Sequence, residues 1–153
     1  MKNIFKIFSV AVALLITAAC GSQNEGPKVS DAIVAEWHLT DMSGTDASGL
    51  PQVYLEFKQD KSFELYQKVG EGRYRKYAGT YTVTDSILSG KYSDGADWGS
   101  SYAVSFEGEI LVLTAQNGSA EVCKYEKKSL PQSDKDNASV VTKADDDQEP
   151  RFL

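Results

Sequence analysis

From residue 35 to residue 128 the chain alternates short strand-like stretches with short turns, and this pattern restricts it to antiparallel β-sheet. Residues 53–58 and 63–69 place an apolar side chain at nearly every second position, which is the spacing of a strand with one buried face. Residues 59–61 between them form a turn of hairpin length. No stretch forms a convincing amphipathic helix of useful length, so the pattern predicts an all-β domain.

Eight strands follow from this pattern. Connections from the second strand onward are mostly short, and Asn117-Gly118 is a strong hairpin signal. Sequential antiparallel strands form an up-and-down meander, and eight of them can close into a barrel that leaves no exposed edge. We therefore expect an all-β fold, an eight-stranded antiparallel up-and-down meander barrel. The expected strands are 35–40, 53–58, 63–69, 73–84, 87–92, 101–106, 110–114 and 121–128, preceded by a helical turn at 31–34.

The two-residue period also predicts which side chains point into the barrel. An eight-stranded barrel has an interior that is either packed solid or holds one small ligand. The inward aromatic side chains fit both interpretations, because they can fill a core or line a largely apolar pocket. Val53, Leu55 and Phe57 are among the apolar side chains expected to point inward. The tyrosines that would line such a pocket are Tyr77, Tyr81, Tyr92, Tyr102 and Tyr125.

Three more side chains are candidates for ligand contacts. Arg73 and Arg75 share the parity of Tyr77, which would place two guanidinium groups near one mouth, where they suit a carboxylate or phosphate headgroup. The alternative for both is a solvated edge. Trp98 follows the loop 93–97 and either caps the open end, stacking on a ligand such as a sugar ring, or packs over the barrel base beside Trp37. We favour packing, because tryptophan buries a large apolar area.

The amino-terminal segment predicts export. Lys2 and Lys6 precede an apolar run at 7–16, and small residues lead to Cys20, which together form a secretory signal. A signal that ends in cysteine resembles the lipobox of bacterial lipoproteins. The resemblance implies that Cys20 carries lipid, that the membrane is the first partner, and that the protein is anchored in the bacterial cell envelope. By the usual sorting pattern Gly21 favours the outer membrane, with the domain periplasmic or surface-exposed. A transmembrane helix or an ordinary cleaved signal are the alternatives.

The flanking segments differ from the strand region in composition. Residues 20–30 are polar and form a flexible tether, and residues 132–153, with the run Asp145-Asp146-Asp147, form a disordered acidic tail because they are too polar to build a core. The expected domains are a signal peptide at 1–19, the tether at 20–30, a barrel at 31–131 and the tail at 132–153. The net charge of −6 argues against nucleic acid as a partner.

Several stretches resemble the lipocalin-like lipoproteins of bacterial envelopes. Trp37 in a first strand after a short turn is similar to the tryptophan that plugs the closed end of lipocalin-type barrels. The resemblance implies a small lipid-anchored barrel, in a family whose members mostly have no assigned function. Ala35 stands where true lipocalins have glycine, and we see no long helix after the last strand. The stretches that carry the resemblance are 53–57, 63–67, 77–81, 88–95, 98–102 and the strand ending at Tyr125.

No constellation in the sequence indicates catalysis. His38 is the single histidine and alternation points it outward, and Cys123, unpaired if Cys20 is acylated, is expected to be a buried apolar residue. We expect no enzyme activity, no cofactor, no metal and a monomer. The expected function is binding of a small apolar or amphipathic ligand. The alternative is an interaction protein with a filled barrel, which docks another envelope component or a glycan through exposed Tyr54, Tyr66 and Tyr74.

Overall fold

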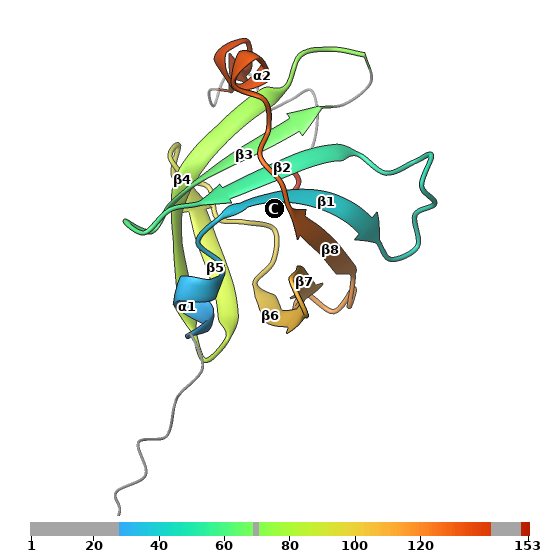
Figure 1. Cartoon of the computed structure of the whole chain (residues 1–153). Helices are drawn as coiled ribbons and strands as arrows, with labels where there is room; N and C mark the ends of the chain where they lie inside the picture. Colours follow the sequence, from blue (N-terminus) through green and yellow to red (C-terminus); the bar gives the residue numbers. More distant parts are fainter. Residues whose placement is uncertain (1–27, 69–70, 142–150) are drawn as a thin grey trace, which may run out of the picture.

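The computed structural model describes residues 28–68, 71–141 and 151–153 (Figure 1). The predicted signal peptide, Cys20 and residues 20–27 of the tether lie outside the described residues, as does the acidic run at 145–147. For these segments the expectations from the sequence stay predictions.

Eight antiparallel strands form a closed barrel, as predicted. Each strand pairs with its neighbour in the chain, and β1 pairs with β8 to close the sheet. The sequence pattern placed every strand to within two residues. The bounds are β1 Glu36–Met42, β2 Gln52–Phe57, β3 Ser62–Lys68, β4 Arg75–Thr84, β5 Ile87–Tyr92, β6 Tyr102–Glu107, β7 Ile110–Ala115 and β8 Val122–Lys127.

One end of the barrel, the closed end, is sealed by helix α1 (Val29–Ala32) and the start of β1 (Figure 1). Trp37 is fully buried there, and its indole Nε1 donates a 2.8 Å hydrogen bond to the carbonyl of Ile33, which is also fully buried. The ammonium group of Lys127 lies 5.6 Å from the centre of the Trp37 ring, a cation–π contact. Trp37 therefore plugs this end, as the resemblance implied.

The core follows the predicted alternation. The inward side chains of β2, β3 and β4 are buried while their chain neighbours are mostly more exposed. Glu121 is an exception. It falls in the expected strand 121–128 with the parity of the buried Cys123 and Tyr125, but it is exposed because β8 begins at Val122 and leaves Glu121 in the preceding loop. Among the residues that the structure describes, twelve large side chains are less than 2 % exposed, so most of the barrel is packed solid.

Trp98 fills a gap in the barrel wall. Strands β5 and β6 pair only at Ile87–Ala103 and Leu88–Tyr102. Beyond this point the main chain of Trp98 donates a 3.1 Å hydrogen bond to the carbonyl of Gly90. A Cβ atom on Gly90 would lie 2.4 Å from the Trp98 ring, so the close approach requires glycine.

The prediction that Trp98 packs is confirmed, but its position differs. Its ring partners are Phe63 at 5.0 Å and Tyr102 at 6.2 Å, whereas the ring partner of Trp37 is Phe106. The reason is that the pairing of β5 with β6 ends at Leu88–Tyr102, and the chain that returns from the β5–β6 loop places Trp98 beside Gly90.

The predicted disordered tail is wrong for residues 132–141. They form helix α2 (Gln132–Asp136) and strand β9 (Ser139–Val140), which pairs in parallel with β4. The physical reason is a set of polar contacts that hydrophobicity does not reveal. The ammonium group of Lys135 lies 2.8 Å from a carboxylate oxygen of Glu36 and 3.0 Å from one of Glu56, and the amide of Ser139 donates to the carbonyl of Tyr74.

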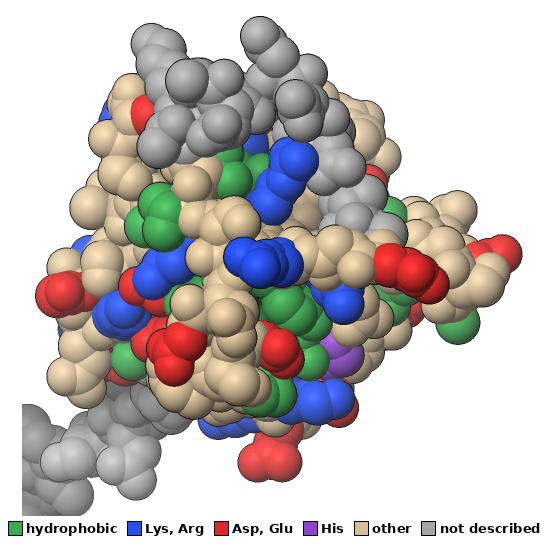
Figure 2. All heavy atoms as spheres, turned by 90° about the horizontal axis from the view of Figure 1, so that it is seen from above, with side chains coloured by type: hydrophobic (Ala, Val, Ile, Leu, Met, Phe, Trp, Pro, Cys, Tyr) green, Lys and Arg blue, Asp and Glu red, His purple; other side chains and the backbone are tan. Residues whose placement is uncertain are grey.

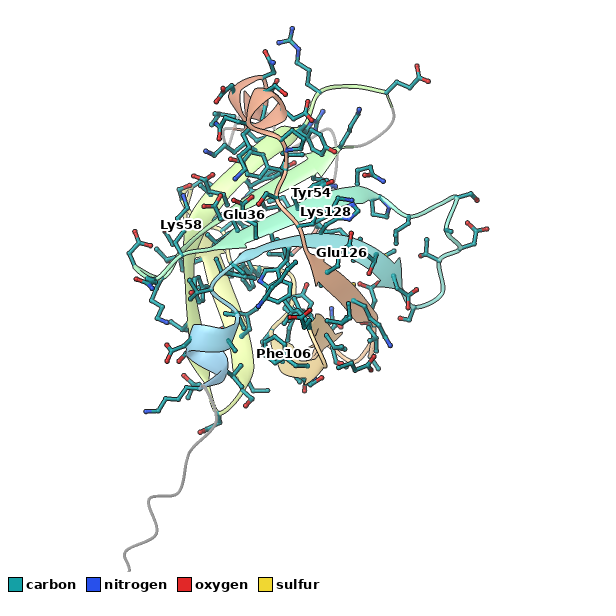
Figure 3. The ribbon with its side chains drawn as sticks, viewed as in Figure 1. Glu36, Tyr54, Lys58, Phe106, Glu126 and Lys128 are labelled. Carbon is teal, nitrogen blue, oxygen red and sulfur yellow. The ribbon has the colours of Figure 1, made fainter. Side chains whose placement is uncertain are left out.

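This carboxy-terminal arm, residues 129–141, covers the outer face of the barrel where we expected an exposed aromatic patch. Tyr66 and Tyr54 are 2 % and 8 % exposed, and both pack with Leu130, while Tyr74 is half-buried beside them. Figure 3 shows Tyr54 on this side of the barrel, close to where the chain leaves β8. The patch is therefore occupied by the chain itself, so the expectation that Tyr54 and Tyr66 are exposed for docking is wrong.

Candidate functional site

The open end of the barrel lies opposite α1 and carries the loops that join β1 to β2, β3 to β4, β5 to β6 and β7 to β8. Aromatic rings from four strands and the β5–β6 loop meet inside the barrel, from Phe63, which lies opposite Phe57 on β2, to Tyr77 and Tyr92 near this end. Ring centroids are 6.0 Å apart between Tyr77 and Tyr92, 5.7 Å between Phe63 and Tyr92, and 6.2 Å between Trp98 and Tyr102. We call Phe63, Tyr77, Tyr92, Trp98 and Tyr102 the open-end aromatic cluster.

The five predicted pocket tyrosines are all buried, but they do not line one pocket. Tyr81 belongs to the closed end, where its hydroxyl donates a 2.8 Å hydrogen bond to the carbonyl of Lys58 and its ring packs edge-on against Phe57. Tyr125 is fully buried in the core, and burial raises the pKa of its hydroxyl well above the ordinary value. Tyr77, Tyr92 and Tyr102 remain as candidates at the open end.

The predicted arginine pair does not form at the mouth. Arg73 is exposed and lies outside β4, which begins at Arg75, so the alternation that we applied to it does not hold. Arg75 is half-buried. The guanidinium group that the structure places over the cluster belongs to Arg151, with its carbon 4.4 Å from the Tyr92 ring centre and 5.7 Å from that of Tyr77.

Arg151 pairs with an acidic residue of the β5–β6 loop. Its guanidinium nitrogens contact both carboxylate oxygens of Asp94, one of them at 3.2 Å. We missed this residue because we predicted disorder throughout 132–153. The sequence signal that could have found it is the pair Phe152-Leu153, two large apolar residues directly after a polar run.

Residues 151–153 occupy the open end. Leu153 is 3 % exposed and belongs to the main hydrophobic core, and Phe152 packs against that core. The Tyr92 hydroxyl donates a 2.9 Å hydrogen bond to the carbonyl of Leu153. The crevice that remains around Arg151, lined also by Tyr77, Tyr92 and Asp94, has a volume of about 20 Å³, roughly enough for one water molecule.

The buried tyrosine hydroxyls and the thiol near this site are neutral at pH 7, in contrast to the charged pair Arg151 and Asp94. Burial raises the pKa of Tyr92, and it raises the pKa of Tyr102 to about 12. Burial, together with the carboxylate of Glu121, raises the pKa of the Cys123 thiol to about 12, so the thiol is a buried apolar group and not a nucleophile. The open end offers aromatic faces and neutral hydroxyl donors.

One polar atom in the cluster has no partner. The indole Nε1 of Trp98 is buried, and among the described residues no acceptor lies within hydrogen-bond distance of it. A buried donor without an acceptor costs about 1–3 kcal/mol, so such groups in folded proteins call for an acceptor from water or a ligand.

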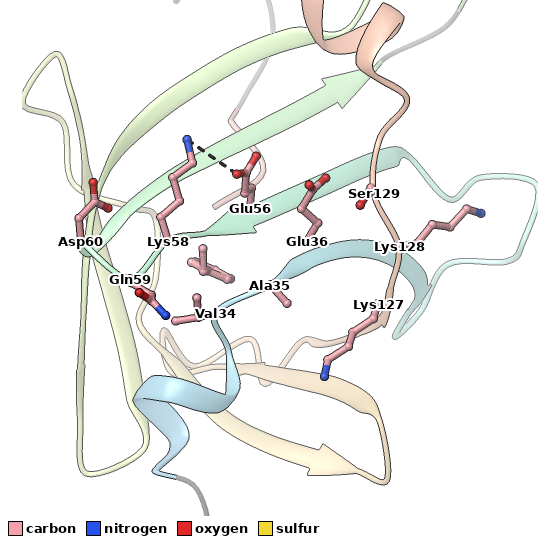
Figure 4. A pocket seen from close by; sticks show the side chains of 11 residues that line it. Val34, Ala35, Glu36, Glu56, Lys58, Gln59, Asp60, Lys127, Lys128 and Ser129 are labelled. Atoms are coloured by element: carbon pink, nitrogen blue, oxygen red, sulfur yellow. Dashed lines mark ion pairs between the residues drawn. The ribbon is translucent and has the colours of Figure 1, made fainter.

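Depressions also lie on the outside of the barrel. A broad, shallow one of about 910 Å³ at the closed end is lined by side chains of both signs, but Lys58 lies 3.8 Å from Glu56 and 3.0 Å from Glu64, so its charges are compensated within the chain (Figure 4). A groove of about 450 Å³ follows the outside of β4 and β5. Its lining is rich in hydroxyl groups and includes Thr80, Thr82, Ser89, Lys91, Asp97, Trp98, Ser100 and Ser101.

Charge and metal-binding groups are dispersed. On the face seen in Figure 2, acidic and basic side chains are interspersed and do not separate by sign. His38 stacks on Tyr54 and its Nδ1 lies 3.3 Å from Glu126. Within the described ranges no three His, Cys, Asp or Glu side chains are grouped to hold a metal ion. Neither described helix is long and apolar enough to cross a membrane.

The comparisons with known proteins agree with this architecture. A family model for a lipocalin-like domain matches residues 33–113, which is more than half of the chain and extends from the closed-end seal to β7. A search of curated proteins finds no match. With the closed eight-stranded barrel and the tryptophan plug, this match shows that the chain belongs to the lipocalin-like domain family.

Proposed function

We propose that the protein is a lipid-anchored lipoprotein of the bacterial cell envelope whose barrel binds a small apolar or amphipathic ligand at its open end. The observation that carries the proposal is the open-end aromatic cluster, in which Trp98 presents a buried donor with no acceptor among the described residues. Binding sites for small molecules are mainly apolar and contain a few placed polar groups, and this cluster has that composition.

The packing limits the size of the ligand. Ile33, Trp37 and Leu65 have no exposed surface, so the closed half of the barrel has no room for a second molecule. A ligand would enter only the open half, where it would contact Tyr77, Tyr92 and the indole of Trp98. Such a site suits one ring or a short alkyl group and not a long acyl chain.

Binding can be tested with N-phenyl-1-naphthylamine, a neutral apolar fluorophore. We expect saturable fluorescence enhancement that weakens in Trp98→Phe, which removes the Nε1 donor, and that is unchanged in Lys128→Gln on the outer surface. The proposal fails if neither the purified chain nor a form without residues 151–153 gives saturable enhancement.

Anchoring is supported by the lipobox-like segment that ends at Cys20. The chain supplies its own matched control, because Cys123 is buried in the barrel and its thiol is not available for acylation. We expect Cys20→Ala to abolish incorporation of radiolabelled palmitate and to release the protein from the membrane fraction, while Cys123→Ala leaves both unchanged. Equal labelling of wild type and Cys20→Ala would refute the anchor.

A second candidate function is glycan binding in the hydroxyl-rich groove outside β4 and β5. The observation that favours it is the row of hydroxyl groups beside Trp98, in which Thr82 and Ser89 already lie 3.1 Å apart. A titration with an N-acetylglucosamine tetramer, followed by calorimetry, tests it. Heat that disappears in the Thr82→Val and Ser89→Ala double variant supports glycan binding, and no heat with the wild type excludes it for this sugar.

A further inference from the structure

The open end holds a positively charged side chain of the chain itself, Arg151. The Arg151 guanidinium lies over the Tyr92 ring and pairs with Asp94, and both side chains of the ion pair are mostly buried, with 10 % and 18 % exposed. A cation over an aromatic face gains most where water is excluded. The Asp94 carboxylate also accepts a 3.0 Å hydrogen bond from the amide of Ala96, which fixes it within the β5–β6 loop and positions it for the cation.

An apolar group of the same segment accompanies this cation. The Leu153 side chain is buried in the core, and its carbonyl accepts the hydrogen bond from Tyr92. Tyr92 therefore contacts both parts of the segment, with its ring under the guanidinium group and its hydroxyl on the carbonyl. The two contacts hold a cation and an apolar group at a fixed distance from each other.

Resting on the proposed function, we propose that the open end recognises a cationic group joined to an apolar group, as in a basic-hydrophobic peptide, and that residues 151–153 are its resident intramolecular occupant. Any ligand of this site must displace the segment. A ligand with a carboxylate headgroup is disfavoured, because its charge would meet Asp94. This reverses the headgroup preference that the sequence suggested through Arg73 and Arg75.

The position of the arm makes the segment a strong competitor. The amide of Val141 donates a 3.0 Å hydrogen bond to the carbonyl of Lys76, next to Tyr77, and Val141 lines the same crevice as Arg151. Nine residues, 142–150, separate Val141 from Arg151 in the sequence. A short tether of this kind gives the segment an effective concentration on the order of millimolar. A free ligand must therefore have a high affinity or a high concentration to replace the segment.

The experiment uses two labelled probes, acetyl-Arg-Phe-Leu-amide and acetyl-Glu-Phe-Leu-amide, with fluorescence anisotropy as the readout. We expect a form without residues 151–153 to bind the arginine peptide, and the intact chain to bind it at least about tenfold more weakly because the tethered segment competes. Asp94→Asn in the shortened form should weaken binding of the arginine peptide and strengthen binding of the glutamate peptide, because it removes the carboxylate that attracts the one and repels the other. Equal binding of both peptides, or equal binding by both protein forms, overturns the inference.

A full-length double variant, Arg151→Gln with Leu153→Ser, is titrated in parallel and gives the same readout if the shortened form does not fold. N-phenyl-1-naphthylamine separates the two proposals. If the freed open end binds this fluorophore but not the arginine peptide, the ligand-binding function stands and the inference falls. If it binds neither, both fall.

Discussion

The Tyr92 hydroxyl and the Leu153 carbonyl are joined by a 2.9 Å hydrogen bond across 61 residues of sequence. The bond ties the end of β5 to a segment that follows the carboxy-terminal arm. It is the one direct hydrogen bond from the open-end aromatic cluster to its occupant that the described residues show. Loss of this bond should therefore loosen the occupant before it affects the barrel.

Replacing Tyr92 with phenylalanine tests this relationship. The change removes one hydrogen bond and should lower the free energy of unfolding by about 1 kcal/mol. Tyr81→Phe is the matched control, because its hydroxyl donates to the Lys58 carbonyl at the closed end and should have a similar cost. Only Tyr92→Phe should speed amide hydrogen exchange at residues 151–153. Equal exchange in the two variants would contradict the proposed role of Tyr92.

Gly90→Ala should destabilise the barrel through a steric clash. The new Cβ atom would lie 2.4 Å from the Trp98 ring, and such overpacking typically costs about 1–3 kcal/mol. Gly99→Ala is the control, since nothing lies within 4 Å of its Cβ position and we expect a change within about 0.5 kcal/mol. Urea denaturation followed by tryptophan fluorescence measures both variants. Comparable midpoints would show that Trp98 can shift away from the new Cβ atom without loss of stability.

The sequence predicted the barrel because its strands follow a two-residue period over most of the chain. Val53, Leu55 and Phe57 repeat the signal within one strand, and each strand adds an independent confirmation of the same fold. The face assigned to a residue fails only where the strand begins later than expected, as at Arg73 and Glu121. Alternation holds inside a strand and gives no information about the turn before it.

The two-residue period could not predict that residues 151–153 occupy the open end. Residues 151–153 are too few to show a period, and their partners Tyr92 and Asp94 lie far away in the sequence. The docking of α2 was missed for a related reason. Lys135 contacts Glu36 and Glu56 as a result of the fold, and composition alone treats all three residues as solvated charges.

Lys135→Met should release α2 from the barrel. The Lys135 side chain is 14 % exposed, bridges Glu36 and Glu56, and lies 5.8 Å from the Tyr66 ring centre. We expect the free energy of unfolding to fall by about 1 kcal/mol, a value between those of exposed and buried ion pairs. We also expect faster hydrogen exchange at the amides of β9.

The control for this change is Lys91→Gln. Lys91 pairs with Asp97 at 2.6 Å, but the two side chains are 54 % and 77 % exposed, so their pairing contributes little. Both variants are compared by thermal denaturation and hydrogen exchange. If the amides of β9 exchange as slowly in Lys135→Met as in Lys91→Gln, the ion pairs of Lys135 do not hold the arm on the barrel.

The Glu64 carboxylate should make stability depend on pH in the acid range. Burial alone raises its pKa, but hydrogen bonds from Tyr66 at 2.6 Å, Lys76 at 2.9 Å and Lys58 at 3.0 Å outweigh burial and lower the pKa from 4.5 to about 2. Between these two values the unfolded chain binds a proton that the folded chain does not.

The stabilisation from this group is therefore fully present above pH 4.5 and is lost as the pH falls toward 2. Glu64→Gln should be less stable than the wild type at pH 7, and the difference should shrink steadily between pH 4.5 and pH 2. Glu109→Gln, in the exposed β6–β7 turn, removes a carboxylate without touching the cluster. Urea midpoints measured across this range decide the point, because a constant difference between Glu64→Gln and the wild type would mean that the cluster does not hold Glu64 ionised.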